Sequence, residues 1–239
     1  MEYSSPVKVR SPFVQSLYSL RHANSRKIAK SKDPDVSEKT IGRLSQYRRI
    51  LKELLDQSLG NVYSHELARR AGVSAAQVRR DLMVVGYSGN PHSGYEIVAL
   101  IKSISNFLDD SQVQRVALIG VGSLGRAILS QFAGNGTRLQ ITAAFDTSGN
   151  ASSSVVTGCR CRPIEELEQV VQGEGIKVGL IAVSSTEAQA AADRLIEVGV
   201  LSIVNLTPAS IQVPDYVHVE NLDITMSVER AAFYARQRD

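Results

Sequence analysis

The sequence has little cysteine and no long apolar segment. Its two cysteines, Cys159 and Cys161, are too few and too close together for a disulfide framework, which favours a reducing compartment. No run reaches the roughly 18 apolar residues that a transmembrane helix needs, and the N-terminus has no apolar core followed by a cleavage site. We therefore expect a soluble, cytoplasmic protein that makes no membrane contact.

Histidine is also scarce, since His218 is the only one after residue 105. A metal site of thiolates and imidazoles needs more neighbouring ligands than Cys159, Cys161 and His218 supply. The sequence therefore predicts no bound metal, and the two cysteines are expected to be ordinary buried or edge thiols.

The formal net charge of +3 conceals an uneven distribution. Residues 1–105 contain 17 Lys and Arg against 9 Asp and Glu, whereas residues 106–239 contain 10 against 15. A basic half joined to an acidic half suggests that only the first half meets a polyanion. The alternative is a solvated basic surface, and charge alone does not separate the two.

The first third of the chain changes character at Ser37. Residues 1–36 carry many Lys and Arg, three prolines and no sustained apolar period, which predicts a flexible basic arm. From Ser37, a plausible N-cap, apolar residues recur at three- and four-residue steps and predict a helix. They are Ile41, Leu44, Tyr47, Leu51, Leu54 and Leu55.

A helix-turn-helix is expected next, formed by residues 64–71, a turn at Gly72 and a helix from about Ser74 to Val85. Apolar periodicity turns Gln77 and Arg80 away from the core and puts Arg79 at its flank. These residues would meet base edges and phosphates in a major groove. A solvated helix in a protein-binding domain is the alternative.

Residues 86–95 are rich in Gly, Ser, Asn and Pro and predict a β-hairpin wing, followed by a linking helix over about 96–108. Ser74 at the start of the third helix and His92 in the wing complete the candidate DNA contacts.

From Gln114 the pattern predicts alternating strands and helices, and hence a parallel sheet with helices on both faces. The segments are 115–119, 123–133, 139–145, 164–171, 178–183, 185–198 and 201–205, with a last helix over 225–236 whose apolar side needs a partner.

A glycine motif follows the first of these strands and opens a helix. It reads Gly120-Val121-Gly122-Ser123-Leu124-Gly125. Its glycines permit a tight turn, close approach of a pyrophosphate and close packing of helix on strand. Asp146, 21 residues past Gly125, ends the next strand, where a carboxylate binds ribose hydroxyls and disfavours a 2′-phosphate. This pattern predicts NAD(H) rather than NADP(H), although such a turn can also bind another nucleotide or nothing.

Several spaced motifs together resemble the Rex family of redox-sensing repressors, over about residues 37–235. They are residues 45–51, 76–82, Gly94-Tyr95, 120–125, Phe145-Asp146, Ala188-Gln189, 205–208, Val213-Pro214 and 220–223. The resemblance implies a homodimeric transcriptional repressor that binds double-stranded, inverted-repeat operator DNA when NADH is scarce and releases it when NADH binds. It also implies that the C-terminal helix is exchanged between subunits, and that Arg49 and Asp223 meet across the dimer.

Four positions depart from the family pattern. The wing has His92 in a region that usually carries Lys or Arg, and Gln131 stands where many members have Tyr near the subunit switch. Ser184 stands where the family usually has Pro. Ile224 occupies a position, near the nicotinamide, that is often Phe or Leu in the family. We expect the nicotinamide to lie beside Ile224 and Leu206.

The predicted fold is α/β, with an N-terminal winged helix, a C-terminal Rossmann domain of doubly wound parallel sheet, and a swapped C-terminal helix. The predicted segments are the arm (1–36), the winged helix (37–98), a linker helix (99–112), the NAD(H)-binding domain (113–222) and the swapped helix (223–239).

Two other classes compete with a repressor. An NAD-dependent dehydrogenase needs a general acid or metal near the nicotinamide, and no such constellation is evident, so an enzyme is not expected. A sensor of a different nucleotide, such as coenzyme A, is disfavoured because Asp146 would repel its 3′-phosphate.

Overall fold

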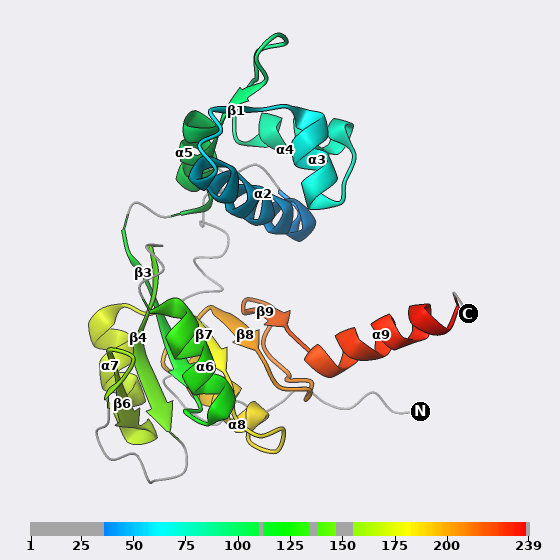
Figure 1. The fold of residues 1–239 in the computed structure, drawn as a ribbon. Coiled ribbons are helices and arrows are strands. Elements are labelled where there is room, and N and C mark those ends of the chain that lie inside the picture. The colour runs from blue at the N-terminus through cyan, green and yellow to red at the C-terminus, as the bar shows by residue number, and fades with distance from the viewer. Residues whose placement is uncertain (1–35, 110–111, 134–137, 147–154, 238–239) are drawn as a thin grey trace. The chain divides into compact units, whose positions relative to one another are not determined.

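The computed structural model describes residues 36–109, 112–133, 138–146 and 155–237. The chain divides into two compact units, residues 1–111 and 112–239 (Figure 1). The basic arm predicted for residues 1–36 lies, apart from Val36, outside the described residues.

The first unit is a winged helix. Its elements are α2 (Glu38–Asp56), β1 (Asn61–Val62), α3 (Ser64–Ala71), α4 (Ala75–Val84), β2 (Tyr95–Glu96) and α5 (Ile97–Leu108). The Ser37 hydroxyl accepts from the Thr40 amide at 3.3 Å, which confirms the predicted N-cap. Gly72 ends α3 in the left-handed conformation at φ +69°, so that α4 can start at once.

The helical stripe predicted from Ser37 supplies part of this unit's core, namely Leu44, Tyr47, Leu51 and Leu54. The largest fully buried side chains are Leu44, Tyr47, Leu51, Leu54, Leu67, Leu82, Ile97, Leu100 and Ile104. The last three lie on α5, which therefore packs with α2 in the first unit rather than acting as a separate linker over 99–112. Ile41 and Leu55, at the margins of the α2 stripe, are exposed.

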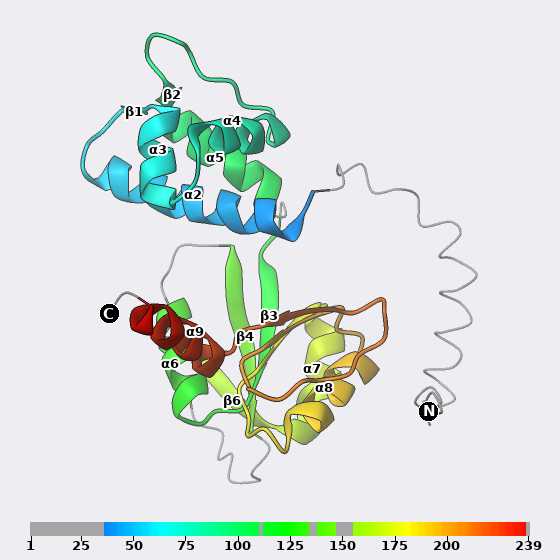
Figure 2. The ribbon, with the colours of Figure 1, turned by 90° about the vertical axis from the view of Figure 1, so that its right-hand side faces the viewer.

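The wing differs from the predicted hairpin. Residues 86–94 project away from the helices (Figure 2), and their only described bridge joins Asn90 and Gly94. The paired strands are β1 and β2, which lie antiparallel with Val62 opposite Tyr95. The Gly, Ser, Asn and Pro residues of the wing favour turns over strands, and this explains the short ladder.

The second unit is a doubly wound sheet with the strand order β5-β6-β4-β3-β7-β8-β9. The strands are β3 (Gln114–Ile119), β4 (Leu139–Asp146), β5 (Val155–Val156), β6 (Cys159–Pro163), β7 (Val178–Ile181), β8 (Ser202–Asn205) and β9 (His218–Asn221). All neighbours run parallel except β5 with β6. The strand order reverses direction between β3 and β7, which is the point where such sheets bind dinucleotides.

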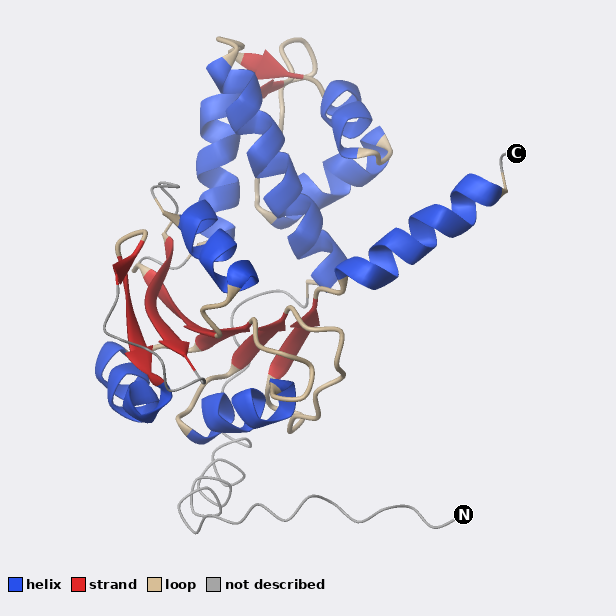
Figure 3. Cartoon of the chain, turned by 60° about the horizontal axis from the view of Figure 1, so that its bottom comes forward, coloured by secondary structure: helices blue, strands red, loops and turns tan. Residues whose placement is uncertain are grey.

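Helices cover both faces of this sheet (Figure 3). They are α6 (Ser123–Phe132), the short 3-10 helix η1 (Ile164–Glu166), α7 (Leu167–Glu174) and α8 (Ala188–Glu197). Alternate residues of β3 face opposite ways: Val116 and Leu118 pack with α6, whereas Ala117 and Ile119 pack with α7 and α8. These findings confirm the predicted α/β class and both domain types.

The last helix, α9 (Ile224–Arg236), contributes nothing to either core. None of its residues is buried, and its five large apolar or aromatic side chains are all exposed. They are Ile224, Met226, Val228, Phe233 and Tyr234. This helix therefore presents an apolar surface that the described residues of the second unit leave uncovered.

Candidate nucleic-acid interface and dinucleotide site

Helix α4 presents a polar, basic face as predicted. Its N-cap Ser74 accepts a hydrogen bond from the Gln77 amide at 3.1 Å, and Val78 is buried beneath the helix. Arg79 and Arg80 are exposed. The Arg79 guanidinium donates to Ser64 Oγ at the start of α3, at 3.2 Å, so the two helices of the motif share a basic edge.

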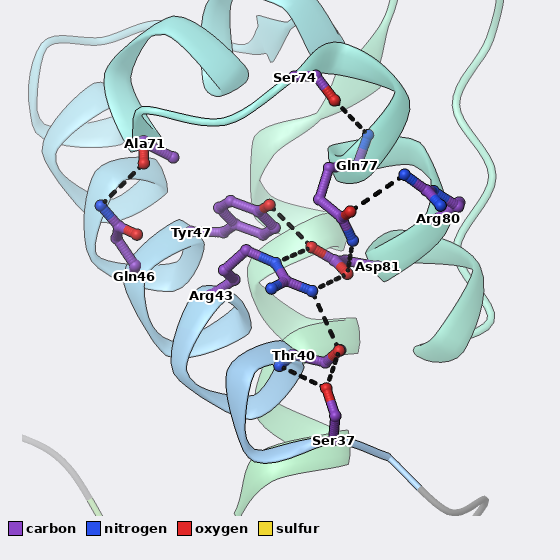
Figure 4. Close-up of polar contacts among 10 residues, drawn as sticks. All are labelled: Ser37, Thr40, Arg43, Gln46, Tyr47, Ala71, Ser74, Gln77, Arg80 and Asp81. Atoms are coloured by element: carbon purple, nitrogen blue, oxygen red, sulfur yellow. Dashed lines mark hydrogen bonds and ion pairs between the residues drawn. The ribbon is translucent and has the colours of Figure 1, made fainter.

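A buried carboxylate on α4 was missed by the sequence analysis. Asp81 is only 2% exposed. It accepts hydrogen bonds from Arg43 Nε (2.6 Å), Arg43 Nη2 (2.7 Å), Tyr47 Oη (2.9 Å) and Gln77 Nε2 (2.8 Å), as Figure 4 shows. An acidic residue next to Leu82 on the core side of α4 is the signal that could have revealed it.

The protonation states in this cluster follow from its contacts. Burial alone would raise the pKa of the Asp81 carboxyl, but the hydrogen bonds it accepts, those from Arg43 first, outweigh burial and hold that pKa below its ordinary value. Burial, and then the hydrogen bond to Asp81, raises the pKa of the Tyr47 hydroxyl. Asp81 is therefore ionised and Tyr47 protonated, and together they join α2 to α4.

The wing tip is held by three contacts. Asn90 and Gly94 exchange backbone hydrogen bonds of 2.8 Å, and Asn90 Oδ1 accepts from the His92 amide at 2.8 Å. The Tyr63 hydroxyl donates to the His92 carbonyl at 2.7 Å. The His92 side chain is consequently exposed on a backbone that is anchored next to the start of α3.

The glycine motif forms the turn from β3 into α6. Gly120 has φ +101°, and a Cβ there would collide with the Ala182 carbonyl oxygen. A Cβ at Gly125 would collide with the Gly120 carbonyl oxygen, so Gly125 permits α6 to approach the strand. Around Gly122, by contrast, a Cβ would meet nothing within 4 Å.

The remaining motif residues complete the turn. Val121 is buried, while Ser123 and Leu124 are exposed on the first turn of α6. Among the residues that the structure describes, no side chain caps the first turn of α6. Its backbone N–H groups and the open space at Gly122 suit an incoming phosphate.

Asp146 lies at the same edge of the sheet as this turn. It ends β4, the strand next to β3, and is partly exposed. The Gly120 amide donates to the Phe145 carbonyl at 2.8 Å, which fixes the glycine turn beside the end of β4. The structure thus brings together the two halves of the predicted adenosine and pyrophosphate site.

Ser184 and Leu206 follow β7 and β8 at this same carboxyl edge. Ser184 Oγ donates to Glu187 Oε2 at 2.5 Å, and the Ser184 amide points to the same oxygen at 3.4 Å. The Glu187 amide in turn donates to the Ser184 carbonyl at 3.0 Å, so these two residues together brace the turn that leads into α8. The Leu206 amide donates to the Ile181 carbonyl at 3.0 Å, and the Leu206 side chain is partly buried.

A second unanticipated cluster surrounds Asn205, which is completely buried. Its amide nitrogen donates to the Ala209 carbonyl (2.7 Å) and to Asn221 Oδ1 (3.0 Å). Its oxygen accepts from the Thr207 amide (3.1 Å) and hydroxyl (2.8 Å). The Leu222 amide donates to the Asn205 carbonyl at 2.9 Å. Asn205 therefore fixes the segment that carries Leu206 to the segment that leads into α9.

The predicted switch residues lie on separate elements. Arg49 is exposed on α2, and Gln131 is exposed on α6. Asp223 caps α9 and accepts from the Met226 amide at 3.0 Å, and the next residue, Ile224, is 68% exposed. The contact predicted between Arg49 and Asp223 joins two subunits and stays a prediction.

Both cysteines are buried in β6, as expected of ordinary thiols. Burial raises the pKa of the Cys159 thiol to about 11, so it stays protonated. Within the described ranges, no three His, Cys, Asp or Glu residues gather into a potential metal site. The same ranges contain no helix that is both long and apolar enough to cross a membrane.

Comparisons with known proteins match both halves of the chain. Residues 35–82 match the family described as "Putative DNA-binding protein N-terminus", and residues 111–209 match the "CoA binding domain" family. The redox-sensing transcriptional repressor Rex of Streptomyces avermitilis is 34% identical over 85% of this chain and 81% of its own length. Rex of Syntrophobacter fumaroxidans is 35% identical over 82% of this chain and 93% of its own.

Solved structures give the same result. RSP, a Rex-family repressor, in complex with NAD⁺ and operator DNA has a TM-score of 0.76 and 28% identity, covering 86% of this chain and 94% of RSP. The RSP complex with NADH has a TM-score of 0.75 and 27% identity, covering 86% and 96%.

Proposed function

Since this chain belongs to the Rex family of redox-sensing transcriptional repressors, we propose that it binds operator DNA through its winged helix and leaves the operator when NADH occupies its Rossmann domain. The observation that carries the proposal is one chain that joins a basic helix-turn-helix to a glycine turn with Asp146 beside it.

DNA recognition is assigned to the exposed side of the first unit. Arg80 projects from α4 and is the best candidate for a bidentate contact to guanine in a major groove. Ser74, Arg79 and His92 are also exposed in this unit and are proposed to contact phosphates or the adjoining groove. The protein acts as a homodimer, because an inverted repeat presents two equivalent half-sites.

The dimer also supplies a partner for α9. A helix without a single buried residue, but with exposed Ile224, Val228 and Phe233, gains stability by packing on a second subunit. We propose that α9 is exchanged between subunits and that Asp223, at its N-cap, meets the partner's Arg49. Gln131 belongs to the same switch region on α6.

NAD(H) is the ligand that Asp146 favours. Its carboxylate binds the adenosine ribose hydroxyls, and the pyrophosphate lies over Gly122. Coenzyme A is the second candidate, favoured by the description of the matched domain family. Its 3′-phosphate would approach a carboxylate at this edge, which disfavours it electrostatically.

The reduced ligand binds more tightly than the oxidised one. Leu206 and Ile224 offer the nicotinamide an apolar surface, and placing the cationic ring of NAD⁺ there carries a desolvation cost that neutral NADH avoids. Ser184, held by Glu187, borders this half of the site.

The chain is proposed to sense its ligand without transforming it. His218, the only histidine of the second unit, opens the parallel strand β9 and thus lies at the edge opposite the glycine turn. No imidazole is therefore available there as a general acid for hydride transfer. A ligand-responsive repressor with reduced, buried thiols is proposed to work in the cytoplasm.

Titration of NADH into a protein–DNA complex tests the proposal. The duplex is an inverted repeat that the protein itself selects from random sequence, labelled for fluorescence anisotropy. NADH should release the duplex at lower concentration than NAD⁺, while NADPH and coenzyme A serve as control ligands. Release by coenzyme A instead of NADH would support the second candidate, and no release by any of them would contradict the proposal.

A further inference from the structure

The orientation of the Gln77 side chain is fixed from the inside of the first unit. Asp81 is buried, ionised and held on one side by Arg43 and Tyr47 of α2. A buried carboxylate needs its hydrogen bonds, and Gln77 Nε2 donates one of them at 2.8 Å. The amide nitrogen of Gln77 is thereby directed inward (Figure 4).

The other end of the same amide meets Arg80. Gln77 Oε1 accepts from Arg80 Nη2 at 3.1 Å, one turn along α4. An ionised carboxylate only accepts hydrogen bonds and a guanidinium only donates them, so a single orientation of the Gln77 amide satisfies both neighbours. The reverse orientation would bring the amide nitrogen against Arg80 and the oxygen against Asp81.

This arrangement leaves Gln77 poorly suited to read a base. A glutamine recognises adenine through both ends of its amide at once, and here one hydrogen bond at each end fixes the amide, which cannot rotate toward a base without breaking them. Arg80, in contrast, keeps further donors on an exposed guanidinium.

We infer that Gln77 is a positioning residue for Arg80, anchored by Asp81, so that this part of α4 reads one base position rather than two. The inference rests on the proposed operator binding. It changes the sequence-based expectation in which Gln77 and Arg80 each meet a base edge. It also implies that Asp81 affects the base preference of the protein, although its buried carboxylate does not contact DNA.

Operator affinities measured for every single-base substitution of the selected duplex test this. Arg80→Ala should reduce discrimination at one position by about tenfold or more, the effect of losing a bidentate contact. Gln77→Met, whose side chain is of similar length but makes no hydrogen bonds, should reduce discrimination at that same position by about threefold. The double variant should lose as much discrimination as Arg80→Ala alone. Relaxed preference at a different position, or additive losses in the double variant, would overturn the inference.

Asp81→Asn and a matched control separate positioning from stability. Asp109→Asn also breaks an ion pair in this unit, with Arg48 at 2.6 Å, but among the described residues no hydrogen bond or ion pair joins Asp109 to α4. Both variants should melt at lower temperature, and only Asp81→Asn should relax the position read by Arg80. If Asp81→Asn and Asp109→Asn changed base preference equally, the proposed role of Asp81 in orienting Gln77 would be overturned. Failure of the unaltered protein to select any sequence would instead refute the proposed function, and this inference with it.

Discussion

Gly122→Ala should remove most dinucleotide affinity and leave the fold intact. Gly122 has φ −68° and ψ −166°, which alanine adopts without strain, and apart from its chain neighbours its new Cβ would meet no described residue within 4 Å. Stability should change by no more than about 0.5 kcal/mol, or about 1–2 °C in melting temperature for a chain of this size. The open space is where a pyrophosphate approaches the backbone, so the methyl group should weaken binding at least about tenfold.

Gly125→Ala is the matched control, because its Cβ would collide with the Gly120 carbonyl oxygen and push α6 from β3. This overpacking should cost about 1–3 kcal/mol of folding free energy. Calorimetry with NADH and with NAD⁺, together with thermal melting of each variant, checks both expectations. The affinity of Gly122→Ala should fall equally for the two ligands, which share the pyrophosphate. Unchanged binding would refute the position assigned to the phosphates.

Substitutions of Asp146, Asn205 and Asp81 test the ribose contact and the two buried polar clusters. Asp146→Asn should narrow the preference for NADH over NADPH, and calorimetry that finds the same ratio of dissociation constants would argue against the ribose contact. Asn205→Ala should lower the free energy of unfolding by about 2–5 kcal/mol, because it leaves buried partners without hydrogen bonds, and a loss under about 0.5 kcal/mol in urea unfolding would contradict that. The pKa of Asp81 is lowered by folding, so its stabilisation should be complete above about pH 4 and be lost as the pH falls through the folded pKa. Urea unfolding of Asp81→Asn should show a smaller loss of stability on acidification, and an unchanged pH dependence would exclude this role.

Local signals explain which elements could be predicted from the sequence. Ser37 and Gly72 mark helix ends through capping chemistry, and the glycine motif marks a strand-to-helix turn. Strand β9 was missed because its four residues are mostly polar and exposed, at the edge of the sheet. Such a strand has neither the alternation nor the apolar run that identifies a strand.

The two buried polar clusters could not be predicted, because their partners are distant in sequence. Arg43 meets Asp81 across 38 positions, and Asn205 meets Asn221 across 16. Periodicity assigns a residue to a face but does not say which polar group will lie opposite. The sequence pattern therefore found Gln77 and Arg80, but the structure was needed to relate them to each other.

The central claim is that NADH and operator DNA oppose each other on one molecule, and calorimetry of NADH binding with and without the selected operator tests it most directly. A ligand that shifts a two-state repressor must bind the two states unequally, and the coupling is reciprocal. Operator DNA should raise the dissociation constant of NADH by the same factor by which NADH raises that of the operator. Equal NADH dissociation constants in the two measurements would contradict the account, even if both ligands bind.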